Sequence, residues 1–143
     1  MTTSVLHSPP ARIHRQDVTV LEQTTADELP RIQELWPSFE RLVGLRGRKT
    51  YARIDERAGT YTVCTPVKPE DRPDSFGLRT GVLPGGRYLR GSLVGEPPGI
   101  YERIGAGMAE LQAAAEADET RPLVEFYRRH DHIELWLPIR SGH

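Results

Sequence analysis

The 143-residue sequence has few of the features that mark several large classes of protein. Its single cysteine, Cys64, excludes a disulfide bond within the chain and is typical of a reducing compartment. No apolar run is long enough to cross a membrane, and no basic segment followed by an apolar one opens the chain. We therefore expect a cytoplasmic protein without a membrane partner.

Lysine is also scarce, because arginine supplies 17 of the 19 basic residues, and 20 acidic residues balance them. The basic residues are spread along the chain and do not follow one helix face, so the usual electrostatic sign of a nucleic-acid partner is missing. The glycine-rich segment Leu83-Pro84-Gly85-Gly86 lacks the spacing of a phosphate-binding loop and is interpreted as a turn before a strand. We expect no direct nucleic-acid contact and no cofactor.

The length fits one domain with one sizeable core. We expect a disordered tail over residues 1–11 and a single domain over residues 12–143, with two halves at residues 12–68 and 76–139. Thr25 and Glu28 form a capping-box pattern before an amphipathic helix that contains Pro37. The apolar positions of the two predicted helices recur at spacings of three and four: Leu29, Ile32, Trp36, Phe39 and Val43, then Ile100, Ile104, Met108, Leu111 and Ala115.

The order of predicted elements is strand, helix, strand, strand, given twice. A seven-residue echo supports this duplication, since residues 61–67 and 133–139 share β-prone positions and a proline at the sixth place. The echo makes Cys64 the counterpart of Trp136. Two such units predict an α+β domain in which both helices cover one face of an antiparallel sheet and a ligand cleft lies between the halves.

The last two strands form a predicted hairpin on either side of residues 129–132. Pairing Val124 with Leu137 and Phe126 with Leu135 gives one wholly apolar face, which we expect to pack on the helices. The same pairing places Glu125 on the other face, beside Trp136 and Tyr127. A carboxylate inside a central strand is costly unless it has a function or a partner, so Glu125 is the first candidate site residue.

Other residues allow both a functional and a structural interpretation. Arg53, Arg87, Arg90 or Arg128 could pair with Glu125 in a purely structural ion pair. The aromatic residues Tyr51, Tyr61, Tyr88 and Trp136 could line a ligand site or pack in the sheet. Cys64 has no basic neighbour in sequence and is interpreted as an inert thiol. His130 and His132 would need a further ligand to hold a metal, and we expect none.

The sequence resembles the GyrI-like family, the effector-binding domain of bacterial multidrug-responsive regulators. The resemblance covers residues 18–139. It depends on Leu35-Trp36 with Phe39, on Gly86-Arg87-Tyr88, and on Glu125-Phe126-Tyr127 before Leu137-Pro138-Ile139. It implies a cleft in which Glu125 and Tyr127 meet cationic aromatic ligands, with Trp136, Tyr51, Tyr88 and Cys64 as further wall residues. The chain has no room for the helix-turn-helix of those regulators, so it resembles a stand-alone member.

Three functions remain open on this sequence. The first is binding of lipophilic, cationic or polyaromatic small molecules, for sensing or sequestration. The second, implied by stand-alone members of the family, is hydrolysis of electrophilic cyclopropane-bearing genotoxic natural products. Glu125 would then act as general base, and a phenol from Tyr51, Tyr88 or Tyr127 would stabilise the oxygen that gains charge, with Tyr127 as the predicted second catalytic residue. The third is inhibition of a larger enzyme by surface contact, which predicts an exposed acidic or apolar patch. The sequence does not predict the oligomeric state.

Overall fold

The computed structural model describes residues 3–44, 46–72 and 77–140 of the protein. The elements follow in the order β1 (Ala11–Arg15), β2 (Val18–Ala26), α1 (Leu29–Val43), β3 (Thr50–Asp55), β4 (Thr60–Pro66), β5 (Arg79–Leu83), β6 (Gly86–Val94), α3 (Gly99–Glu102), α4 (Ile104–Ala114), β7 (Leu123–Arg129) and β8 (His132–Pro138). None of the helices in the described part of the chain is long and apolar enough to span a membrane.

The strands form one antiparallel sheet in the order β1-β6-β8-β7-β3-β4-β2-β5. The order β6-β8-β7 on one side of the centre is repeated as β2-β4-β3 on the other, and the two sets meet where β7 pairs with β3. In each set the first strand, β2 or β6, is followed by one main helix, α1 or α4, and then by the other two strands. The fold is therefore the duplicated α+β arrangement that the sequence predicts.

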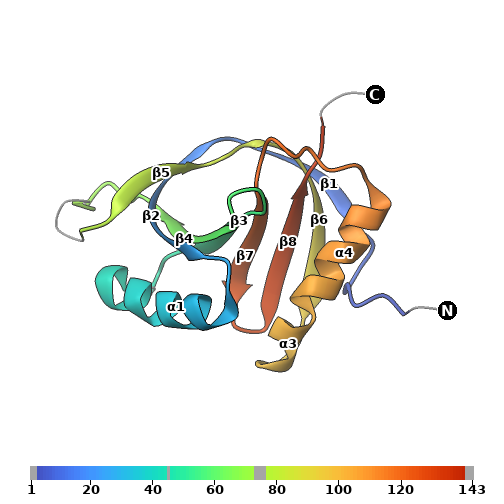
Figure 1. Ribbon diagram of the computed structural model, residues 1–143, viewed down its shortest axis with the longest axis horizontal. Helices are drawn as coiled ribbons and strands as arrows, with labels where there is room; N and C mark the ends of the chain where they lie inside the picture. The colour runs from blue at the N-terminus through green and yellow to red at the C-terminus, as the bar shows by residue number, and fades with distance from the viewer. Residues whose placement is uncertain (1–2, 45, 73–76, 141–143) are drawn as a thin grey trace.

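The outer strands join the two halves into a continuous two-stranded ribbon. Arg15 of β1 pairs with Gly86 of β6, and Val18 of β2 pairs with Leu83 of β5, so the register continues across the short break between the strands. Gly85 makes this crossing possible, because a Cβ there would lie 2.5 Å from the carbonyl oxygen of Arg15. The segment from Leu83 to Gly86, which was predicted as a turn, therefore connects β5 to β6 within this ribbon. The β1–β2 and β5–β6 connections both arch over the rest of the sheet (Figure 1).

The arching ribbon curls the sheet around a cluster of buried side chains, here called the inner cluster. All eight strands contribute to it: Ile13, Val18, Val20, Tyr51, Cys64, Leu83, Tyr88, Val124, Phe126 and Trp136. Cys64 and Trp136 lie on the same face, as the sequence echo predicts. The face away from the helices is therefore largely filled by packed side chains.

The opposite face, here called the helix face, carries α1 and α4, which lie apart over different halves of the sheet (Figure 1). Leu35 and Phe39 of α1 pack on β3 and β4, and Met108 and Leu111 of α4 pack on β6 and β8. Gly107 brings α4 close, since a Cβ there would lie 2.7 Å from a methyl carbon of Leu135. Leu123 and Tyr127 contact both helix-covered clusters and therefore lie between the halves.

The register of the last hairpin differs from the prediction by one residue. Val124 pairs with Trp136 and Glu125 with Leu135, so Val124 and Phe126 belong to the inner cluster. Only Leu135 and Leu137 pack under α4 as predicted. The prediction treated the helix face as the only apolar one, whereas the curled sheet buries both faces. When both faces of a hairpin are buried, an apolar face is possible in either register and does not select one of them.

Smaller differences concern the ends of elements. Thr25 lies within β2, and α1 begins at Leu29 with Glu28 at its N-cap and no capping side chain, because pairing of β2 with β4 continues to Ala26. Pro37 does not divide α1. Strand β5 was missed, since its five residues include a glycine and do not alternate.

The N-terminal tail, which we expected to be disordered, makes specific contacts. The backbone nitrogen of Val5 donates to Glu110 at 2.7 Å, that of His7 donates to Ser92 at 2.8 Å, and Leu6 packs against the cluster under α4. The predicted start of the second half, Phe76, lies outside the described residues. The domain limits of 12–143 remain a prediction.

Candidate functional site

Glu125 lies at the centre of a hydrogen-bonded group on the helix face, here called the Glu125 cluster and formed by Glu125, Tyr127, Tyr61 and Trp36. The hydroxyl of Tyr127 donates to Oε1 of Glu125 at 2.6 Å, and that of Tyr61 donates to the same oxygen at 3.2 Å. The indole nitrogen of Trp36, on α1, donates to the Tyr61 hydroxyl at 3.1 Å. The Trp36 and Tyr127 rings meet edge to face, with centroids 4.8 Å apart.

The sheet register explains why these side chains meet. Glu125 pairs across the strands with Ala52 and Leu135, and the methyl side chain of Ala52 leaves room above the carboxylate. Tyr61 lies on β4, one strand beyond β3, and points to the same face. Trp36 lies on the apolar stripe of α1, whose packing brings the indole over the sheet.

Burial dominates the electrostatics of this cluster. Glu125 is only 7% exposed, and desolvation raises the pKa of its carboxyl above the usual 4.5, although the bonds from Tyr127 and Tyr61 act in the opposite direction. Burial and the nearby carboxylate raise the pKa of Tyr127 and of Tyr61, so both phenols remain protonated donors. Glu125 is thus a buried acid held by neutral donors.

The structural interpretation of Glu125 as an ion-pair partner has no support in the described residues, where no basic side chain pairs with it. Arg53 pairs instead with Glu22 at 2.8 Å, and Arg128 with Glu134 at 3.2 Å. Asp27 adds further negative potential at Glu125. A buried carboxylate without a cation is the arrangement that a cationic ligand would complete.

The raised pKa predicts a pH-dependent cost in stability. The folded protein binds the Glu125 proton more tightly than the unfolded chain, so this contribution to stability is complete at low pH and is lost as pH rises through the raised pKa. The melting temperature of Glu125→Gln should therefore exceed that of the wild type by a margin that grows with pH. Thermal unfolding of both proteins across a pH series measures it; a margin that shrinks with rising pH would contradict the burial argument.

The other predicted wall residues lie on the opposite face from Glu125. Tyr51, Tyr88, Cys64 and Trp136 all belong to the inner cluster. The hydroxyl of Tyr88 is occupied by the carbonyl oxygen of Pro84 at 2.5 Å, and burial raises the pKa of the Cys64 thiol to about 12, which makes it inert. The structure thus unites Glu125 with Tyr127 and separates both from the remaining four candidates.

A groove of about 830 Å³ lies between the two halves at one end of the sheet. It is lined by residues 54–58 at the end of β3 and in the β3–β4 turn, residues 117–123 before and into β7, and Pro138. Its side chains include four carboxylates, Asp55, Glu56, Asp118 and Glu119, against two arginines, Arg57 and Arg121. Ile54 and Leu123 in its wall pair across β3 and β7. This pair lies on the same face as the pair Ala52–Glu125 and is the next one along the strands. The groove is therefore acidic, and one of its walls is adjacent to the pair that contains Glu125.

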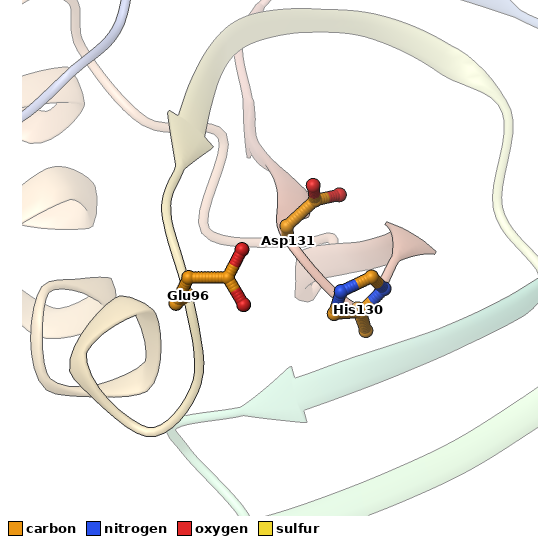
Figure 2. A group of neighbouring side chains, drawn as sticks. All are labelled: Glu96, His130 and Asp131. Carbon is orange, nitrogen blue, oxygen red and sulfur yellow. The ribbon is translucent and has the colours of Figure 1, made fainter.

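Three exposed or half-buried side chains could approach a metal ion together. Glu96 comes from the segment after β6, and His130 and Asp131 come from the β7–β8 turn, with potential ligand atoms within 4.8 Å of one another (Figure 2). His132, the other predicted candidate, is not in this group. Exposed groups of this kind are common without a metal, and we assign no metal to it.

The GyrI-like fold is confirmed by comparison with solved structures. SAV2435 bound to tetraphenylphosphonium matches over 94% of this chain and 95% of that chain, with a TM-score of 0.69 and 15% identity. The integron cassette protein VCH_CASS2 from the mobile metagenome of Vibrio cholerae matches over 92% and 96%, with a TM-score of 0.71 and 17% identity. A hydrolase from Listeria innocua matches over 94% of both chains, with a TM-score of 0.54 and 11% identity.

At these identities the likeness shows the fold alone. No protein-family model matches the sequence, and no curated protein is similar to it. The shared fold is one in which a small molecule is bound in at least one solved structure, that of SAV2435.

Two members of the Glu125 cluster were not placed there by sequence reasoning. Tyr61 was one of several aromatic candidates, and Trp36 was assigned to the helix core. One signal pointed to Trp36, since a buried indole N–H needs an acceptor and the sheet below α1 offers a tyrosine. Linking Trp36 to Tyr61 required the docking position of α1, which periodicity does not supply.

Proposed function

We propose that this protein binds lipophilic, cationic or polyaromatic small molecules at the Glu125 cluster, for sensing or sequestration of foreign compounds. The observation that carries the proposal is the buried Glu125 carboxylate, which accepts hydrogen bonds from two neutral tyrosine hydroxyls and which no described basic side chain neutralises. A cation close to such a carboxylate gains more Coulomb energy than it would in water, and desolvation offsets part of that gain.

The acidic groove lies beside this site, although no member of the Glu125 cluster lines it. Its excess of carboxylates attracts cations, and its inner wall at Leu123 lies next to Glu125 on the same face. Trp36 and Tyr127 are half-buried, and their ring faces offer the contacts that a cationic or flat aromatic ligand uses. The binding of tetraphenylphosphonium by SAV2435, which shares the fold, makes a lipophilic phosphonium the natural first probe.

Titration with matched ligands tests the proposal. Tetraphenylphosphonium should bind at least about tenfold more tightly than triphenylphosphine oxide, a neutral compound with similar rings, because only the cation pairs with Glu125. Isothermal titration calorimetry measures both affinities. The cation's advantage should also decrease as pH falls toward the usual glutamate pKa of 4.5, since protonation removes the charge of Glu125. Equal affinities at neutral pH would refute Glu125 as a counter-charge.

Hydrolysis is the second candidate, and the geometry around Glu125 favours it in one respect. A carboxyl whose pKa is raised by burial is suited to accept a proton from water. The Tyr127 hydroxyl, which donates to Glu125 at 2.6 Å, would have to donate instead to the oxygen that gains charge. Tyr51 and Tyr88, which the sequence also offered for that second task, lie on the other face. An electrophilic cyclopropane would be the substrate class.

A further inference from the structure

A second concave site lies at the mouth of the curled sheet, with a charge opposite to that of the Glu125 cluster. This pocket, here called the basic pocket, has a volume of about 710 Å³, within the usual range for small-ligand sites. Its walls come from β1, β3, β6, β7 and β8 and the residue before β3: Ile13, His14, Arg15, Lys49, Tyr51, Arg90, Phe126, Arg128, Arg129, Glu134 and Trp136.

Aromatic rings form one wall of the basic pocket. Tyr51 and Phe126 are stacked with centroids 4.5 Å apart, and Trp136 meets them edge-on at 5.7 Å and 6.0 Å. Phe126 is half-buried, so part of this aromatic surface faces the pocket. The Arg15 guanidinium carbon lies 5.1 Å from the centroid of the Trp136 ring. A flat ring would find both aromatic surface and guanidinium groups to stack on.

The charge of the basic pocket is strongly positive. Among the described residues that line it, Glu134 is the only carboxylate, and both of its oxygens are engaged: one accepts from Arg128 at 3.2 Å and the other from the Trp136 indole at 3.0 Å. In the described ranges of the chain, no ion pair holds the four remaining cations, Arg15, Lys49, Arg90 and Arg129. Four cations that converge on one hollow repel one another unless an anion lies between them.

We propose that the basic pocket binds a planar aromatic anion, a ring system that carries one carboxylate, sulfonate or phosphate group. The acidic group would lie between Arg15, Arg90 and Lys49, and the ring would lie against Phe126 and Tyr51. This site is independent of the proposed cation site, because it lies on the other face of the sheet and selects the opposite charge. The hollow shape and its aromatic wall favour a small molecule over an extended polyanion, which would need cations along an open surface.

The two tryptophans of the chain report on the two sites separately. Trp36 belongs to the Glu125 cluster and Trp136 to the basic pocket, and the indole N–H of each has a distinct acceptor, Tyr61 or Glu134. In ¹⁵N-labelled protein, 2-naphthalenesulfonate should shift the indole signal of Trp136 and leave that of Trp36 in place. The matched cation, 2-naphthyltrimethylammonium, should not shift Trp136. The spectrum of Trp36→Phe assigns the two signals.

Substitutions test the role of charge. Arg15→Gln and Arg90→Gln should each weaken naphthalenesulfonate binding by about tenfold, the loss expected for one charge-assisted hydrogen bond. Arg12→Gln is the matched control, because Arg12 is exposed on the same strand and does not line the pocket. Wild-type affinity should also fall as salt is added. Glu125→Gln should leave the anion's affinity unchanged, so failure of the cation site would not affect this result.

Several outcomes would overturn the proposal. These are a shift of Trp36 alone, equal binding of anion and cation at Trp136, an affinity that salt does not change, or an equal loss in Arg12→Gln. Binding of single-stranded RNA without binding of the small anion would do the same, since it would assign the pocket to a polynucleotide. The salt series uses the wild type, so it decides the matter even if a substituted protein fails to fold.

Discussion

Replacing Glu125 with glutamine is expected to weaken tetraphenylphosphonium binding by about tenfold to a hundredfold, which corresponds to about 1.4–2.8 kcal/mol. Glutamine keeps the size of the side chain and can still accept the bonds from Tyr127 and Tyr61, so the change removes the charge and little else. Calorimetric titration of the purified variant at neutral pH gives the difference directly. The affinity for triphenylphosphine oxide should stay the same.

Two further variants make this result specific. Glu34→Gln removes the same charge from an exposed position on α1 and should leave binding within about twofold of the wild type. Tyr127→Phe removes the 2.6 Å hydrogen bond that favours the charged carboxyl, so the pKa of Glu125 should rise further and cation binding should be lost at a higher pH. If Glu125→Gln binds the cation normally but stops turnover of an electrophilic substrate, Glu125 is a general base and the hydrolase is the better assignment.

Truncation of Phe39 to alanine is expected to cost about 3–5 kcal/mol of unfolding free energy, the usual cost for a fully enclosed aromatic ring. Phe39 is 0% exposed and packs between α1 and the sheet, in the cluster that also contains Tyr61 and Trp36. This loss is a large part of the stability of a typical small domain. Urea unfolding followed by circular dichroism measures the change.

Leu42→Ala is the matched control for Phe39→Ala. Leu42 lies one turn further along the same helix and is 40% exposed, so its truncation should cost less than about 1 kcal/mol. A similar loss in both variants would mean that α1 is not docked through the face that the structure shows. Because α1 also carries Trp36, Phe39→Ala should weaken tetraphenylphosphonium binding at temperatures where the protein remains folded.

The order of elements and the duplication were predictable because each depends on local signals. The spacing of four and three residues between Ile32, Trp36 and Phe39 predicts one helix, and the shared proline of residues 61–67 and 133–139 aligns the halves. Glu125 was predictable as a candidate for a different reason. A carboxylate within an apolar strand conflicts with its surroundings, and such conflicts gather at functional sites.

The face on which Glu125 lies was not predictable from the same signals. Its position depends on the register of β7 against β8, and both faces of this hairpin are apolar because the ribbon curls the sheet over the inner cluster. The pairing of β1 with β6 and of β2 with β5 joins residues that are distant in sequence, and β5 has no alternating pattern. Arg15, Lys49 and Arg90 come from different parts of the sequence. Their meeting in one pocket depends on the same long-range strand pairing.

The two-stranded ribbon has a consequence for how the protein folds. It joins residues 11–15 to residues 86–90 and residues 18–22 to residues 79–83, so β1 and the outer edge of β2 stay unpaired until β5 and β6 have been made. Contacts between residues so far apart require closure of large loops before they contribute stability, and proteins dominated by such contacts fold slowly. During synthesis, β1 and one edge of β2 would remain unpaired, although β2 can already pair with β4. The nascent chain is therefore most exposed to aggregation in the interval before β5 and β6 emerge.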